Sequence, residues 1–130
     1  MSKKDACLDV LNRLLIAEQY FKGTKYGGIV ETASAAFAAK RFEECLKELD
    51  KLPSREDLFE SLLEKLKGKS VYRTLEKIKK GQTQDSCSVL KAISSLLTHA
   101  AIEVEQGNRE YRYLFPTLLD RLCEIVYSIR

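Results

Sequence analysis

Proline and glycine are scarce in this sequence, with two and six residues respectively among 130. That scarcity excludes a fibrous or low-complexity chain, because such chains are rich in both residues. The sequence also lacks an uninterrupted apolar run of about 18 residues, so it predicts no helix that spans a membrane. Near the N-terminus, Asn12, Arg13 and Glu18 interrupt the apolar residues, which argues against a signal peptide. We therefore expect a cytoplasmic protein without a membrane partner.

Residues and motifs that carry catalysis are also few. His99 is the only histidine, and no GxGxxG, P-loop or GxSxG motif occurs. His99 and Glu103 stand one helical turn apart and could share a ligand or act as an acid–base pair, although the other ligands of a di-iron bundle are missing. The alternative is a partly exposed histidine that pairs with a neighbouring side chain. We predict that the protein is not an enzyme and that it binds no metal or cofactor.

The four cysteines, Cys7, Cys45, Cys87 and Cys123, are far apart, and none belongs to a CxxC motif. A zinc site would require these separate residues to converge, with one histidine as the only nitrogen ligand. Each cysteine lies in a segment with helical apolar periodicity, as expected of a small side chain that fills space in a core. We expect four reduced, structural thiols, because disulfides need an oxidising compartment.

Hydrophobic residues make up 45% of the chain and charged residues 32%, so the chain can form both a core and a hydrated surface. Its length is that of one domain, since two domains of half this size would each be hard to stabilise. We therefore expect a single helical domain over residues 1–130. No segment alternates apolar and polar residues as a strand with hairpin turns would.

Apolar residues recur at intervals of three and four, which predicts helices along the whole chain. These stripes cover residues 7–21, 29–39, 42–49, 58–66, 70–80, 89–104 and 111–129, and the second stripe could run on into the third. The sequence predicts an all-α fold, a compact bundle of five to seven helices built from αα-hairpins, with longer first and last helices. In the last stripe, Leu118 and Leu122 are expected in the core.

Capping and turn residues mark the ends of several predicted helices. Ser54 opens a capping-box-like sequence before one helix, and Asp85 or Ser86 can cap another. Gly68 is expected to stop the helix that precedes it, since glycine adopts the left-handed conformation at little cost. Pro116 predicts either a kink or a helix that starts nearby.

Charge placement is the feature that points to a partner. The formal net charge is only +3, but residues 65–80 contain seven basic residues and a single acid, Glu76. On a helix, Arg73, Lys77 and Lys80 lie on one side, opposite an apolar side that anchors the helix. A basic stripe of this kind can present several cations to a phosphate backbone.

The candidate binding residues of this segment are Lys65, Lys67, Lys69, Tyr72, Arg73, Lys77 and Lys80. The opposite, apolar side comprises Val71, Leu75 and Ile78. In a complex with nucleic acid, the cations would contact phosphates and Tyr72 would stack on a base. The alternatives are contact with an acidic protein surface and an ordinary solvated helix face.

Two hypotheses for function follow. The first is a non-catalytic small helical subunit or adaptor that packs by its helix faces into a larger protein or ribonucleoprotein assembly. The alternative is a subunit that contacts nucleic acid through residues 65–80. In size, helical class and basic stripe, though in no motif, the chain resembles the small all-helical subunits that line the guide–target groove of CRISPR effector complexes. Protein partners are expected, nucleic acid is the alternative partner, and the sequence is compatible with a homo-oligomer.

Overall fold

The structure is a computed structural model that describes residues 2–81 and 85–128, with the side chains of residues 78 and 79 outside that description. Within these residues the helices are α1 (Lys3–Phe21), α2 (Gly27–Ala38), α3 (Phe42–Leu49), α4 (Glu56–Lys65), α5 (Ser70–Lys79), α6 (Ser86–Glu105), the 3-10 helix η1 (Arg109–Tyr113) and α7 (Leu114–Ser128), and there is no strand. The predicted all-α class is confirmed. The expected relative lengths are wrong in one respect, because α6 is the longest helix with 20 residues, whereas α7 has 15.

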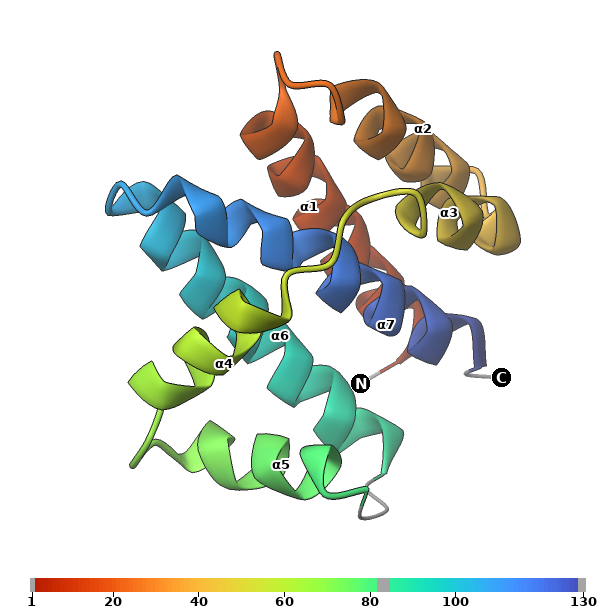
Figure 1. Cartoon of the computed structure of the whole chain (residues 1–130). Coiled ribbons are helices and arrows are strands. Elements are labelled where there is room, and N and C mark those ends of the chain that lie inside the picture. The colour runs from red at the N-terminus through yellow and green to blue at the C-terminus, as the bar shows by residue number, and fades with distance from the viewer. Residues whose placement is uncertain (1, 82–84, 129–130) are drawn as a thin grey trace.

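Helix α7 lies in the middle of the bundle, where it contacts α1, α3 and α6 (Figure 1). The α2–α3 hairpin packs against α1 and α7, and the α4–α5 hairpin packs against α6 on the other side of the bundle. Helices α1 and α6 are joined by side-chain hydrogen bonds: Ser94 donates to Asp9, and Tyr20 donates to Glu105 further along both helices. The α4–α5 hairpin, which holds most of the basic segment, is therefore attached to the bundle mainly through α6.

The buried side chains of the described residues form one connected core. Helix α7 supplies its centre, since Phe115, Leu119, Leu122 and Val126 are each at most 1% exposed. Leu118 is 5% exposed, so the expected burial of both Leu118 and Leu122 is confirmed. The regular apolar stripe of α7 reflects its position, because a helix with neighbours on several sides needs apolar residues around much of its circumference.

Three predicted helix boundaries are confirmed. Gly68 follows α4 with a φ of +87°, in the left-handed region that favours glycine. The carboxylate of Asp85 caps α6 by accepting a 2.8 Å hydrogen bond from the amide of Ser88. Pro116 lies in the first turn of α7, where a missing amide donor leaves no helical hydrogen bond unmade.

The predicted cap at Ser54 is wrong. The residue that precedes α4 is Arg55, and no side chain caps the amides of the first turn there. Instead, the guanidinium of Arg55 donates two hydrogen bonds, of 2.9 and 2.7 Å, to the carboxylate of Asp57. These bonds lower the pKa of Asp57. A charged, two-point contact is stronger than the neutral hydroxyl–amide bond that a serine cap would supply.

All four cysteines are free thiols in the structure, but their surroundings differ. Cys45 of α3 and Cys123 of α7 are fully buried, with their Sγ atoms 3.9 Å apart, and Cys7 is half-buried beside the core. The expectation of a core position is wrong for Cys87, which is exposed. Cys87 lies in the first turn of α6, before Leu90, the first buried residue of that helix.

Helix α6 is long and apolar enough to cross a membrane by length and composition alone. Its apolar character has a direct use in the bundle, because Leu90, Ile93, Leu96 and Leu97 are all buried in the core. A core helix with neighbours on several sides has the same composition as a short membrane span.

A pair of carboxylates lies where the end of α3 meets α7. Partial burial raises the pKa of Asp120 from 3.8 to about 6, and the negative charges of Asp50 and Glu124 contribute to the shift. The protonated form of Asp120 donates a hydrogen bond to Asp50. Because its pKa is higher in the folded chain than in the unfolded chain, Asp120 contributes stability below about pH 4, and this contribution is lost as the pH rises through about 6.

Replacing Asp120 with Asn is therefore expected to stabilise the protein at neutral pH. The amide keeps a donor for Asp50 and carries no charge, so the free energy of unfolding should rise by about 1 kcal/mol at pH 7, after allowance for solvent screening. Urea unfolding of the variant and the wild type, measured between about pH 4 and pH 7, checks this. The difference should vanish near pH 4, and a variant that is less stable than the wild type at pH 7 would contradict the assignment.

Candidate functional site

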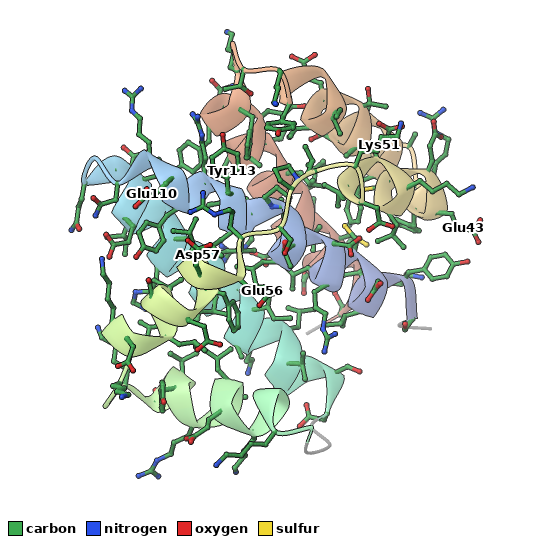
Figure 2. The ribbon with its side chains drawn as sticks, in the orientation of Figure 1. Glu43, Lys51, Glu56, Asp57, Glu110 and Tyr113 are labelled. Carbon is green, nitrogen blue, oxygen red and sulfur yellow. The ribbon has the colours of Figure 1, made fainter. Side chains whose placement is uncertain are left out.

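Three of the predicted binding residues lie together on the outer side of α5 and its approach. Lys69, Arg73 and Lys77 follow one another at intervals of one helical turn, and all three are exposed. None of them takes part in an ion pair within the described residues. Figure 2 shows nitrogen-tipped side chains that extend from α5 away from the rest of the bundle. We call these three residues the basic face of α5.

Three other predicted residues are neutralised by neighbouring carboxylates. The ion pairs join Lys65 to Glu103 at 2.6 Å, Lys67 to Glu64 at 2.9 Å and Lys80 to Glu76 at 3.3 Å. Exposed pairs of this kind contribute little to stability, but they leave no net charge at their position. The proposed stripe of Arg73, Lys77 and Lys80 therefore loses Lys80 and gains Lys69 as its unpaired third member. Lys79 and Ile78 of the same segment lie outside the described side chains.

Lys65 has a structural role and is not part of the basic face of α5. Its ammonium binds Glu103 of α6 and lies 5.1 Å from the centre of the Tyr111 ring in η1, so it ties α4 to the end of α6. The bond with Glu103 raises the pKa of Lys65 and lowers that of Glu103. Glu103 also accepts a 2.7 Å hydrogen bond from Asn108. Lys65 and Asn108 occupy this carboxylate, so the structure does not favour the acid–base pair of His99 and Glu103 that the sequence left open, and His99 is half-buried.

Tyr72 has a different environment from the one expected of a stacking residue. It is half-buried and packs against the core on the side of α5 that also carries Leu75, which is 4% exposed. On its accessible side it lines one groove with Glu64, Glu76 and Lys80, and another with Lys69 and Arg73. Because Glu64 and Glu76 are paired with lysines, the partial burial of the ring is what makes Tyr72 less accessible to a nucleic-acid base than the sequence suggested.

A second surface, which the sequence analysis missed, lies between the first half of α1 and the α2–α3 hairpin. It is a groove with a volume of about 620 Å³, which we call the apolar groove. Its floor is formed by Cys7, Leu8, Leu11, Phe37, Ala38 and Phe42, and its rim by Lys3, Lys4 and Lys40. The Phe37 and Phe42 rings meet edge to face at 5.1 Å, which fixes the floor on the hairpin side.

The exposure of two leucines on α1 shows that no other part of the described chain covers this side of the helix. Leu8 is 52% exposed and Leu15, two turns further along the helix, is 45% exposed. Neither residue belongs to the stripe of α1 that faces the core, where Val10 and Leu14 are fully buried. The signal was present in the sequence, because residues 7–21 hold more large apolar residues than one core-facing stripe requires.

A smaller cavity of about 230 Å³ lies where α4 and α5 meet α6 and α7. Its wall is apolar, with Phe59 and Leu75 on one side and Ile93 on the other. Charged residues of both signs also line it: Glu56, labelled in Figure 2, Arg121, and Arg55, whose guanidinium is bound by Asp57. This mixed lining gives the cavity no clear preference for an anionic or a cationic ligand.

The described residues contain no cluster of three or more histidine, cysteine, aspartate or glutamate side chains that could hold a metal ion. Comparisons with protein-family models, curated protein sequences and solved structures find no match to this chain. The two surfaces, the basic face of α5 and the apolar groove, are therefore interpreted from their own geometry.

Proposed function

We propose that this protein is a non-catalytic helical adaptor or small subunit that binds another protein in the apolar groove. The observation that carries the proposal is the 52% exposure of Leu8 in the apolar floor of this groove. Water contact with a concave apolar surface is costly, and a partner that covers the surface gains the hydrophobic free energy. Grooves between helices are also a recurrent place for protein recognition.

The proposal is tested by placing a photo-crosslinking amino acid at Leu8 and, as a matched control, at exposed Gln106 at the far end of α6. In cells of the natural source, the Leu8 position should give a discrete protein adduct that the Gln106 position does not give. The adduct is identified by mass spectrometry, and the identified protein is then purified. It should bind the wild-type chain and lose about tenfold in affinity for Leu8→Gln, because a polar amide replaces a contacting leucine. Equal adducts at both positions, or none at Leu8, would refute the proposal.

Contact with nucleic acid through the basic face of α5 is the second candidate function. It is favoured by one observation, the exposure of Lys69, Arg73 and Lys77 without ion pairs in the described part of the chain. Three cations at helical intervals can follow the phosphates of a single strand. The paired state of Lys65, Lys67 and Lys80 reduces the number of expected phosphate contacts from the set that the sequence suggested.

A further inference from the structure

The charged residues that line the apolar groove itself are all lysines. Lys3 and Lys4 stand on α1 at one edge, Lys40 stands on the hairpin at the other, and no carboxylate lines the groove. All three lysines are exposed, and within the described residues none of them forms an ion pair. A cationic rim around an apolar floor is complementary to a surface in which carboxylates flank apolar side chains.

The dimensions of the apolar groove suit a helix. The α1 residues that line it run from Lys3 to Leu11, a span of about 12 Å at the rise of an α-helix. Leu15 lies on the same side of α1 as Leu8, so the span from the rim lysine Lys3 to Leu15 is about 18 Å. This length matches about 12 residues of a bound helix, which would present apolar residues at i, i+3, i+4 and i+7.

We infer that the apolar groove binds a short amphipathic helix of a partner protein, in which acidic residues flank the apolar side. The inference rests on the proposed function, because it names the partner of the same groove. A second copy of this chain fits less well. It would place the lysines of one groove against the same lysines of the other, and like charges across an interface oppose association.

The backbone conformation of Lys40 is a further unusual feature of the rim of the apolar groove. Lys40 has a φ of +63°, which is unfavourable for a residue with a side chain. The other residues with positive φ in the described part of the chain are all glycines: Gly23, Gly68, Gly81 and Gly107. A glycine would relieve this strain in the turn after α2, so a substitution at this position can test whether the ammonium group contributes to binding.

The probe is a fluorescent, end-blocked peptide of about 14 residues, stapled as a helix, with leucines at i, i+3, i+4 and i+7 and glutamates on both flanks. A second peptide carries lysine in place of each glutamate. Anisotropy titrations with the whole chain at about 50 mM salt should show that the acidic peptide binds at least about tenfold more tightly than the basic one. This preference should shrink as salt is added.

Variants locate the binding. Changing Lys3, Lys4 and Lys40 together to Gln should remove the preference for the acidic peptide, and Leu8→Gln should weaken its binding about tenfold. A matched control, Lys22→Gln with Lys25→Gln and Lys91→Gln, removes three exposed lysines elsewhere and should leave the preference unchanged. Unchanged circular dichroism of each variant shows that the loss of binding is not a loss of fold.

Lys40→Gly separates binding from stability. Glycine relieves the positive φ, so the melting temperature should rise by about 2–4 °C. The same variant lacks the rim ammonium and should bind the acidic peptide about threefold more weakly. A residue with only a structural role would not show opposite changes in the two measurements.

The inference is overturned if the two peptides bind equally, if neither binds, or if Leu8→Gln leaves the affinity unchanged. It is also overturned if the wild-type chain forms a dimer that Leu8→Gln dissociates, since the occupant would then be a second copy. A protein adduct at Leu8 together with failure of the acidic peptide would leave the proposed function standing and reject only the acidic helix. Absence of the adduct at Leu8 would reject the proposed function itself.

Discussion

Replacing Leu122 with Ala is expected to lower the free energy of unfolding by about 2–5 kcal/mol. Leu122 is fully buried on α7, which contacts α1, α3 and α6, so the shortened side chain would leave a cavity bounded by several helices. Helices that hold one another in place close such a cavity only in part, and the lost contacts are not replaced. The loss is a large share of the free energy of unfolding of an ordinary domain.

Urea unfolding with a two-state analysis measures this change, and Leu8→Ala is the matched control. The control removes the same atoms from a side chain that is 52% exposed, so it should cost less than about 1 kcal/mol. A loss below about 0.5 kcal/mol for Leu122→Ala would show that α7 is not the centre of the core. Similar losses for both variants would show that Leu8 is also buried, which would contradict the apolar groove.

Changing Lys69, Arg73 and Lys77 together to Gln is expected to abolish most of any affinity for single-stranded nucleic acid. If each cation contacts one phosphate, the slope of log K against log salt should fall by about 2, because each contact on a single strand contributes about 0.7. At about 50 mM salt this corresponds to a loss of about two to three orders of magnitude in affinity. The fold should persist, since these side chains point away from the core that holds Leu75.

The control for this experiment is Lys47→Gln with Lys51→Gln on the α3 side of the molecule. Lys51 forms a 2.8 Å ion pair with Glu48, and acidic residues are frequent in this segment, so the control should change nucleic-acid binding little. Filter binding or anisotropy with single-stranded RNA and DNA over a salt series provides the measurement. No affinity of the wild type at about 50 mM salt, or an equal loss in the control, would exclude nucleic-acid contact through the basic face of α5.

The helical class and several helix ends could be predicted from the amino-acid sequence alone, because they depend on interactions within a few residues. Apolar spacing of three and four defines a helix face wherever the chain is placed. The stop at Gly68 and the cap at Asp85 likewise depend on backbone preferences and on a neighbouring amide. Burial of Leu118 and Leu122 was predictable for a similar reason, since a regular stripe on a helix faces the core.

Local rules failed where a residue had a competing partner. Ser54 had the sequence of a cap, but Arg55 and Asp57 formed a stronger charged contact beside it.

Cys87 shared the periodicity of α6, but it lies in the first turn, beyond the part of the helix that the bundle covers. Periodicity shows which side of a helix is apolar, and it does not show how far along the helix the neighbours reach.

Which charges are free and which apolar residues are covered depends on how the helices pack against one another. Lys65 and Glu103 are distant in sequence, and their 2.6 Å pair exists because α4 packs beside the end of α6 and η1. Together with the pairs of Lys67 and Lys80, this pair leaves Lys69, Arg73 and Lys77 as the basic residues without an ion pair in the described part of this segment. In the same way, the α2–α3 hairpin covers one side of α1 and leaves Leu8 in contact with water. The number of unpaired charges and open apolar surfaces is set by which helices meet, and that depends on the packing of the whole core.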